Sequence, residues 1–518
     1  MELRKICSIA LLSAVTMSVM AVPASREGIL RTDAEGTEKM VFLNGDEFFH
    51  YVTDANGNWL DEETLLPMPE EQKTARKQVQ NGRAKARRIQ HETGLDRTIA
   101  PRGAVILVSF ADLAFLGTHE DMVDWAMGDN NTYNGATGSI RQYFLDQSWG
   151  QYEMQIDIIG PVTVSKGYAY YGENDWKTGD DMHADEMVKE ACILAHDSLG
   201  VDFSRYDNNG NGNVDWVVII YAGYGEASGA PENTIWPHQY ELSYTDMDFK
   251  LDGKTIDHYC CLNELNGTKG KTRCGIGTFC HEFCHVMGLP DFYATNSARH
   301  RTLADWDIMD YGPYNNGGNT PPNFSAYERW FMGWFKPRLV NSAASVILPS
   351  LHEYHSACFM TEQGDDIDNI LHPNPKTFYL FENRQQKGWD KFLPGAGLMV
   401  TKVQWSSTKW SENTVNNTAI NMGVDMIEAT PNSSDLGDET DLYPAGADAF
   451  SKIAAYQVTN IAMADEVVTF DVNGGGPQIH LDVTNVAVDK AAQKIIREGR
   501  VLIVRNGVTY DLNGRMIE

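Results

Sequence analysis

The sequence predicts a layered domain of mixed helices and strands, α/β or α+β, over residues 103–338. Two continuous apolar runs, AVILVSF at 104–110 and WVVIIY at 216–221, are typical of buried central strands. Residues 139–147 and 182–199 have helical periodicity instead. Strands that alternate with helices pack as layers around a common core, and we therefore predict one layered domain here.

A second, β-rich domain is predicted over residues 339–473. This part of the chain consists of short β-like runs separated by turn residues, and the clearest runs are 345–348, 377–381, 397–403 and 467–472. The run of three glycines and a proline at 474–477 is typical of a linker. Residues 474–518 are thus assigned to a linker and a short C-terminal tail.

Composition and charge exclude several classes of protein. The chain has 518 residues, of which 42% are hydrophobic and 22% charged, as in ordinary globular proteins. Its net charge is −29, with 71 acidic and 42 basic residues. Nucleic-acid binding needs clustered lysine and arginine, so we expect no nucleic-acid partner. No segment after the first 21 residues is long and apolar enough for a transmembrane helix.

The first 21 residues are typical of a secretory signal peptide. Arg4 and Lys5 form a basic start, a largely apolar stretch occupies 9–20, and Val19 and Ala21 are small residues at the −3 and −1 positions of a cleavage site. An apolar stretch of about 12 residues is too short to span a bilayer as an anchor. The sequence therefore predicts a protein that is secreted or lies at the cell surface.

Residues 22–102 differ in pattern from the layered domain and are interpreted as a prosegment. Short alternating runs with Asn-Gly turns come first, and residues 70–102 are helical in composition and locally basic. The alternative is a solvated helix and linker without a regulatory role. The prosegment contains no cysteine, which excludes a thiolate that blocks a metal. A carboxylate such as Asp46 is a candidate for that role.

Seven cysteines remain after removal of the signal peptide. An odd number leaves at least one thiol free within a chain. Seven in about 500 residues is too sparse for a disulfide scaffold, and we expect buried thiols with one or two bridges. The seven are Cys192, Cys260, Cys261, Cys274, Cys280, Cys284 and Cys358.

The strongest functional signal is a metal-binding pattern, HEFCH, at 281–285. Residues 278–288 are predicted to form a helix, on which His281 and His285 share one face and can bind the same zinc ion. Glu282 lies on an adjoining face, where its carboxylate can take a proton from a water that the metal activates. Cys280 and Cys284 lie off the face of the histidines and are interpreted as packing residues.

The residues after this helix supply a third candidate ligand. Gly288 lies where the chain has to turn sharply, and glycine tolerates the positive φ that such a turn needs. Asp291 lies ten residues after His281, and a carboxylate oxygen is an acceptable zinc ligand. The alternative for Asp291 is a turn residue after Pro290.

Further along, the segment WDIMDYG at 306–312 is interpreted as a turn that carries a methionine beneath the metal site. Met309 would pack under the histidines as structural support. Tyr311 is a candidate donor of a hydrogen bond to the developing oxyanion, with an ordinary turn aromatic as the alternative. Asp305, Asp307 and Asp310 are expected to cap the turn.

A calcium site is predicted at 207–215, with the sequence DNNGNGNVD. Oxygen side chains fall at positions 1, 3, 5 and 9, with glycine at position 6, as in an EF-hand loop. Position 12 is a valine, and a strand begins where an EF-hand has a helix. The predicted ligands are Asp207, Asn209, Asn211 and Asp215 through side chains and Asn213 through its carbonyl. The alternative is an Asn/Gly turn without metal.

Together these motifs resemble the immune inhibitor A-like secreted bacterial metallopeptidases. HEFCHVMGLPD at 281–291 and DIMDYG at 307–312 carry the resemblance, and SIRQYF at 139–144, FENRQ at 381–385 and GDEFFH at 45–50 agree with it. The resemblance implies an α+β, zincin or metzincin-like catalytic domain, a latency prosegment that acts as an intramolecular inhibitor, and a β-rich domain after it. It also implies that His281, His285 and Asp291 bind zinc and that Glu282 is the general base.

The sequence therefore predicts a secreted, zinc-dependent endopeptidase that is made as a latent precursor and hydrolyses extracellular proteins or peptides. One alternative is a non-catalytic surface adhesin stabilised by zinc and calcium. The other is a metal-dependent hydrolase of non-peptide substrates. Glu282 argues against the adhesin, because a structural zinc site has no use for a base.

Overall fold

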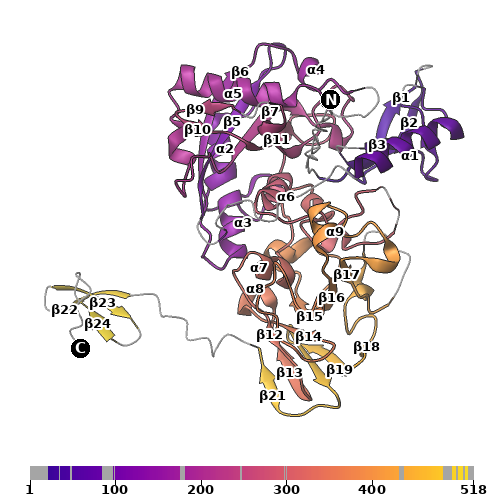
Figure 1. The fold of residues 1–518 in the computed structure, drawn as a ribbon, viewed down its shortest axis with the longest axis vertical. Coiled ribbons are helices and arrows are strands. Elements are labelled where there is room, and N and C mark those ends of the chain that lie inside the picture. Colours follow the sequence, from indigo (N-terminus) through magenta and orange to yellow (C-terminus); the bar gives the residue numbers. More distant parts are fainter. Residues whose placement is uncertain are drawn as a thin grey trace, which may run out of the picture.

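The computed structural model describes residues 22–33, 36–46, 49–62, 64–84, 97, 100–175, 181–245, 248–296, 298, 300–430 and 437–481, and three strands between 493 and 510. The predicted signal peptide and much of the predicted basic segment lie outside these residues. The described chain contains helices and several separate sheets (Figure 1). This mixed architecture confirms the general fold class.

A five-stranded sheet forms the upper part of the molecule in Figure 1. Its strand order is β6-β5-β7-β11-β8, in which β6, β5, β7 and β11 are parallel and β8 is an antiparallel edge strand. The bounds are β5 Arg102–Ser109, β6 Gln155–Thr163, β7 Val217–Tyr224, β8 His238–Glu241 and β11 His258–Leu265, with the small hairpin β9 Lys250–Leu251 and β10 Lys254–Thr255 nearby. The apolar runs predicted as central strands are β5 and β7, which are neighbours in the sheet.

Helices pack against this sheet through apolar side chains. Helix α6, Gly277–Val286, packs Phe283 edge-on against Trp216, with ring centroids 5.1 Å apart. Gly103 on β5 is required beneath that tryptophan, because an added Cβ would come within 1.9 Å of the indole ring. The other helices of this part are α2 His119–Met127, α3 Ile140–Gln147, α4 Tyr168–Tyr171 and α5 Ala184–Leu199, and α7 Ala326–Phe331 lies next to the strands of the lower part (Figure 1).

The lower part of the molecule contains two further five-stranded sheets. Their orders are β12-β14-β15-β16-β17 and β18-β19-β20-β13-β21. The first is built from β12 Arg338–Leu339, β14 Ala357–Thr361, β15 Thr377–Arg384, β16 Gly397–Gln404 and β17 Val424–Met426. The second is built from β13 Ala344–Leu348, β18 Phe450–Ile453, β19 Tyr456–Ala464, β20 Val467–Val472 and β21 Gln478–His480, and the short helices α8 Leu351–Tyr354 and α9 Ser407–Ser411 connect strands.

The upper and lower parts share one hydrophobic core. Trp330 of α7 packs against Phe359 on β14 and Phe378 on β15, with ring centroids 4.9 and 5.7 Å apart. The largest buried cluster runs from the upper sheet through α6 to these strands. Helix α6 lies between the two parts in Figure 1. A second buried cluster, which includes Phe381 and Phe470, lies between the two lower sheets and belongs to the lower part alone.

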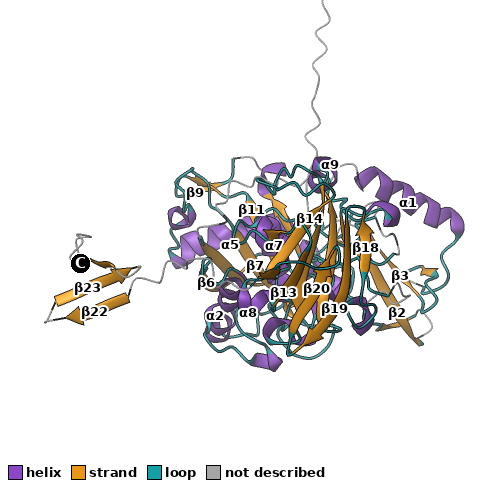
Figure 2. Ribbon diagram, turned by 90° about the horizontal axis from the view of Figure 1, so that it is seen from below, coloured by secondary structure: helices purple, strands orange, loops and turns teal. Residues whose placement is uncertain are grey.

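The N-terminal region forms a small unit beside the upper sheet. It comprises an antiparallel sheet of β1 Ile29–Thr32, β2 Glu38–Asp46, β3 Phe49–Thr53 and β4 Trp59–Leu60, with helix α1 Glu70–Ala84 at the rim of the molecule (Figure 2). Its core cluster includes Ala227 and Trp236 from the chain between β7 and β8. The remaining strands, β22 Gln493–Arg497, β23 Arg500–Arg505 and β24 Val508–Tyr510, form a separate antiparallel sheet.

All seven cysteines are free thiols, so the prediction of one or two bridges is wrong. Six of the thiols are buried and Cys274 is half-buried. Cys260 and Cys261 share β11, and Cys280 and Cys284 share α6. The buried thiols pack in the core as small apolar side chains.

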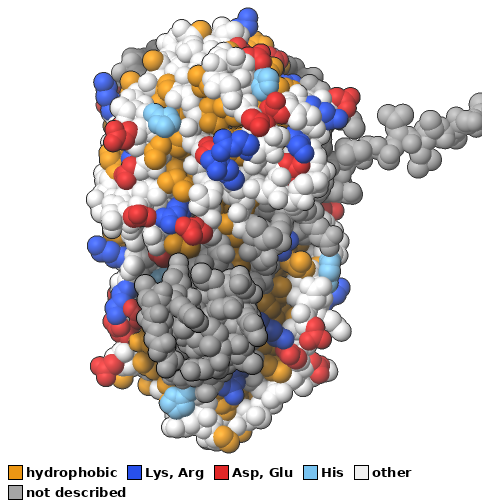
Figure 3. Space-filling view, turned by 90° about the vertical axis from the view of Figure 1, so that its left-hand side faces the viewer, with side chains coloured by type: hydrophobic (Ala, Val, Ile, Leu, Met, Phe, Trp, Pro, Cys, Tyr) orange, Lys and Arg blue, Asp and Glu red, His pale blue; other side chains and the backbone are white. Residues whose placement is uncertain are grey.

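Among the described residues, no helix has the length and apolarity needed to cross a bilayer. On the face drawn in Figure 3, acidic and basic side chains are interspersed, with small hydrophobic areas between them.

A buried ion pair fixes the N-terminal region to the upper part. His50 Nε2 on β3 lies 3.0 Å from Glu226 Oε1, and the His50 ring stacks on Trp236 with centroids 5.0 Å apart. Burial alone would lower the pKa of His50, but the charge and hydrogen bond of Glu226 raise it to about 9. Glu62 adds to this effect and Arg76 opposes it.

We predict that His50→Gln destabilises the chain only where His50 is charged. Because the pKa is raised on folding, the stabilisation is complete below about 6.5, the value for an unperturbed histidine, and is lost as pH rises through about 9. The expected difference in unfolding free energy from the wild type is on the order of 3 kcal/mol at pH 6, falling towards zero above pH 9.5. Urea unfolding followed by the fluorescence of the intact chain measures it. A difference that stays constant from pH 5 to 10 would contradict the assignment.

Candidate metal centre

Helix α6 places two imidazoles side by side. His281 and His285 lie one turn apart on the same face, and their Nε2 atoms are 3.0 Å from each other. Both side chains are fully buried. The helix begins at Gly277 and ends at Val286, so its last residue lies two positions before the predicted end at Gly288.

The turn after α6 brings the third residue to the same point. Gly288 has a φ of +95°, a conformation that glycine adopts without steric cost. The reversed chain places Asp291 Oδ1 3.2 Å from both Nε2 atoms. Among the described residues, one group of His, Cys, Asp and Glu side chains converges closely enough to hold a metal ion. It consists of His281, His285 and Asp291. The predicted ligands are therefore together, and Cys280 and Cys284 are not among them.

The protonation of the two histidines fits a metal. Nδ1 of His281 faces the carbonyl of Ile308 and Nδ1 of His285 faces the carbonyl of Leu289, each at 2.7 Å. A carbonyl only accepts, so both Nδ1 atoms carry the proton and both Nε2 atoms present lone pairs. Burial lowers the pKa of His281, which favours the neutral ring.

Three electron-rich atoms thus face one another in a buried space. The pKa of Asp291 is held below its usual value by the two imidazoles, against the effect of burial, so the carboxylate is ionised. Two lone pairs and a carboxylate within 3.2 Å repel one another unless a cation lies between them. Ligands of a tetrahedral zinc ion at about 2.0–2.1 Å lie about 3.3 Å apart. The donor set and its spacing therefore fit zinc.

The predicted methionine turn lies directly against this group. Met309 is fully buried, and its carbonyl accepts a hydrogen bond of 2.7 Å from the N–H of Phe292, next to Asp291. Asp307 accepts from the N–H of Met309 at 2.8 Å, and Asp310 accepts from the N–H of Ala304 at 2.9 Å. These bonds hold the turn closed, as predicted for Asp307 and Asp310, whereas the capping role of Asp305 stays a prediction.

Asn413, which the sequence analysis did not identify, orients the third ligand. Its side-chain oxygen accepts from the Asp291 N–H at 2.8 Å, and its side-chain N–H donates to Asp291 Oδ2. Asn413 comes after α9, 122 residues along the chain from Asp291. Its carbonyl also accepts a hydrogen bond from Thr295 at 2.7 Å. The β-rich lower part thus completes a centre whose ligands come from the upper part.

Glu282 is buried next to the ligands. Its Oε1 atom accepts a hydrogen bond of 2.8 Å from the backbone N–H of Val22, so the N-terminal region reaches the centre. The guanidinium of Arg26 lies 3.5 Å above the ring of Tyr311. Burial raises the pKa of Tyr314, and the charges of Tyr311 and Glu282 add to this effect.

The predicted calcium loop is a turn closed by its own hydrogen bonds. Asp207 Oδ2 pairs with the Lys254 ammonium at 2.7 Å and accepts from the Gly212 N–H at 3.0 Å. Asp215 accepts from the side chain of Asn208 at 2.6 Å. Asn209, Asn211 and Asn213 lie in the same turn.

Comparison with known proteins agrees with this geometry. Residues 117–337 match the family model described as "Immune inhibitor A peptidase M6, catalytic domain". This part of the chain is thus similar to the catalytic domain of the immune inhibitor A peptidases. The chain is also 28% identical over 299 residues to the pre-pro-metalloprotease PrtV of Vibrio cholerae, and 28% identical over 217 residues to immune inhibitor A of Bacillus thuringiensis subsp. alesti.

These two matches cover 49% and 37% of the chain but only 32% and 31% of the relatives, about a third of their length. The immune inhibitor A peptidase match includes α6, the turn at Gly288 and Met309, and it therefore assigns a metallopeptidase domain to this part of the chain. The match ends before Asn413.

We predict that Asn413→Ala weakens zinc binding by about 10- to 100-fold, because Asp291 loses the group that orients it while all three ligands remain. Competition with a chromogenic chelator measures the affinity. Asn460→Ala, which removes an exposed asparagine from β19, is the matched control and should bind zinc like the wild type. Equal affinities of the two variants would show that Asn413 has no such role.

Proposed function

We propose that this chain is a secreted, zinc-dependent endopeptidase that hydrolyses peptide bonds of extracellular proteins and is made as a latent precursor. The observation that carries the proposal is the convergence of His281, His285 and Asp291 within 3.2 Å, with Glu282 beside them on α6. The metallopeptidase match over the same residues supports it. The predicted signal peptide supports secretion.

In this proposal, His281, His285 and Asp291 would hold the zinc ion, which would supply a Lewis acid for the substrate carbonyl and for the attacking water. Glu282 takes the proton from the attacking water and delivers it to the leaving amine. Tyr311 is proposed to donate its phenol O–H to the oxyanion. Gly288 and Met309 hold the ligands in place. The low dielectric of the buried centre strengthens each of these interactions.

Latency is proposed to come from the N-terminal region, residues 22–102. Its Val22 contacts Glu282 directly, and a general base engaged by the chain itself cannot meet a substrate. Cleavage in the basic segment near residues 85–97 would then release the site. The blocking contact is thus proposed to be the backbone of Val22 and not Asp46, the carboxylate considered for this role.

We predict that the Glu282→Gln variant, after cleavage of its chain beyond α1, has a kcat/KM on casein or a peptide library about 10²–10⁴-fold below that of the equally cleaved wild type. The variant should still bind one zinc per chain, because the ligands are unchanged. Casein cleavage and metal content are measured before and after chelation. Hydrolysis at the wild-type rate would contradict the role of Glu282.

The same measurement separates the two alternatives. A zinc-stabilised adhesin would bind the metal but would cleave nothing, with or without Glu282. A hydrolase of non-peptide substrates would leave the library intact and yet depend on Glu282 for another ester or amide. The peptidase match favours peptide hydrolysis over both.

Calcium at residues 207–215 is proposed as a second, stabilising metal. We predict that millimolar Ca²⁺ raises the melting temperature of the chain by a few degrees, since binding to the folded state alone stabilises it by mass action. Asp215→Asn should abolish the shift, whereas Asp54→Asn, at another turn, should keep it. Equal melting temperatures in Ca²⁺ and in a calcium chelator would overturn the site.

A further inference from the structure

The first described residues form a buried segment that reaches the metal centre. Val22 and Ala24 are 1% and 2% exposed. The N–H of Ala24 donates to the carbonyl of Gly45 at 2.8 Å, and that of Ser25 donates to the carbonyl of Ala227 at 2.9 Å. The backbone of the segment is therefore held between the N-terminal sheet on one side and the upper part of the molecule on the other.

Two side chains from residues 103–338 bind the first two carbonyls of this segment. Trp236 Nε1 donates to the carbonyl of Val22 at 3.2 Å, and Tyr314 Oη donates to the carbonyl of Pro23 at 2.5 Å. Carbonyls are present in every peptide, so these two donors can hold an extended chain without regard to its side chains.

The direction of the segment is that of a cleavage product. Peptide hydrolysis leaves a new amino group on the C-terminal fragment, next to the general base that delivered its proton. Val22 N lies 2.8 Å from Glu282, and the chain leads away from the centre towards its C-terminus. Cleavage of the predicted signal peptide after Ala21 would make this nitrogen an α-ammonium group, the same group that such a product carries.

We propose that Trp236 and Tyr314 are positioning residues that bind the backbone carbonyls of the first and second substrate residues on the C-terminal side of the scissile bond. In the precursor, Val22 and Pro23 occupy these two positions as a product-like plug. This inference rests on the proposed peptidase function and on cleavage after Ala21.

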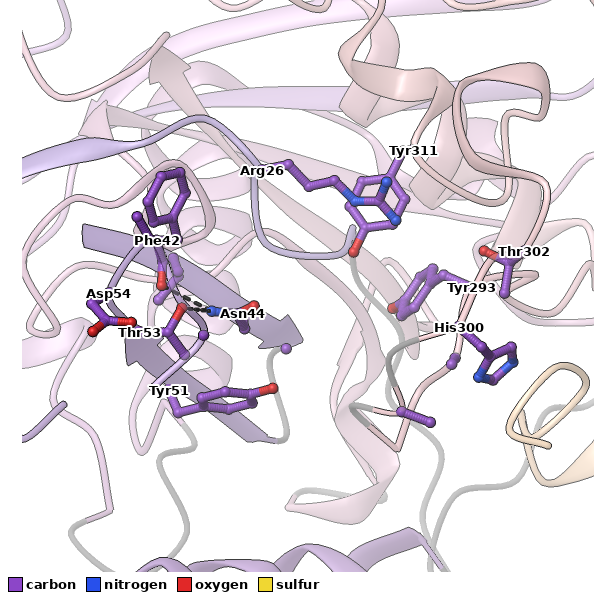
Figure 4. A pocket seen from close by; sticks show the side chains of 16 residues that line it. Arg26, Phe42, Asn44, Tyr51, Thr53, Asp54, Tyr293, His300, Thr302 and Tyr311 are labelled. Atoms are coloured by element: carbon purple, nitrogen blue, oxygen red, sulfur yellow. Dashed lines mark hydrogen bonds between the residues drawn. The ribbon is translucent and has the colours of Figure 1, made fainter. Parts of the chain in front are cut away.

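Arg26 anchors the plug beyond the centre. Its guanidinium stacks on Tyr311, and Figure 4 shows both at the wall of a cavity of about 450 Å³. Tyr293 and Thr302 lie on the same side of the cavity as Tyr311, and strand residues of the N-terminal region line the other side. Departure of the N-terminal region would therefore uncover this space and Tyr311.

The first arm of the test uses the full-length secreted chain and needs no hydrolysis. The rate of acylation of the Val22 amine, measured by mass spectrometry of the N-terminal peptide, is compared between native and urea-unfolded protein. We expect the native amine to react at least tenfold more slowly. Tyr314→Phe should raise the native rate about three- to tenfold, because one bond that holds the plug is lost.

The second arm uses the chain after cleavage of the basic segment and release of the N-terminal region. The probe is the peptide Val-Pro-Ala-Ser-Arg with a fluorophore at its C-terminal end, and its affinity is measured by fluorescence anisotropy. N-terminal acetylation should weaken binding at least tenfold, since the charged partner of Glu282 is lost. Tyr314→Phe and Trp236→Phe should each weaken it three- to tenfold, and should raise KM for a peptide substrate with kcat within about twofold.

Matched controls separate positioning from general damage to the fold. Tyr224→Phe and Trp149→Phe also remove one hydrogen bond each, to the carbonyls of Gly270 and His352, and should change neither arm. The proposal would be overturned if the free and acetylated peptides bound with equal affinity. It would also be overturned if Tyr314→Phe and Tyr224→Phe bound the free peptide with equal affinity. If the peptide binds as expected but no substrate is cleaved, the peptidase function fails and the binding positions stand.

Discussion

The structure depends on one electrostatic constraint, which is that two imidazole lone pairs and an ionised carboxylate face one another within 3.2 Å in the core. Such an arrangement is unfavourable without a cation, so the surrounding chain has to impose it. Carbonyls of Ile308 and Leu289 fix both rings from behind. Helix α6 is in turn packed on Trp216 of the upper sheet and lies within the core that both parts share. The layered fold therefore acts mainly to hold three atoms at metal-binding distance.

The lower sheets have a direct part in this constraint. Asn413 bonds to both the backbone N–H and the carboxylate of Asp291, and Thr295 bonds to the Asn413 carbonyl. A ligand in a turn after a helix would otherwise be free to rotate away. The β-rich part thus contributes to the metal centre as well as to the shared core, even though the peptidase match ends at residue 337.

Local pattern was sufficient to predict the elements that carry the metal ligands. The apolar runs of β5 and β7, the helices α3, α5 and α6, and the turn at Gly288 lie within a few residues of their predicted positions. Strand β11 was not predicted, because its buried Glu264 breaks the apolar pattern, and this carboxylate accepts backbone bonds from Leu116 and Gly117. Asn413 and Val22 act through contacts 122 and 260 residues apart in sequence, which no local pattern encodes.

The central claim is that His281, His285 and Asp291 together hold one zinc ion. The most direct measurement is a crystal structure of the full chain with diffraction data on both sides of the zinc absorption edge. The account predicts one strong anomalous peak at about 2.0–2.2 Å from both Nε2 atoms and from Asp291 Oδ1. A zinc peak at other residues, or no peak here when the crystal is grown with zinc, would contradict it.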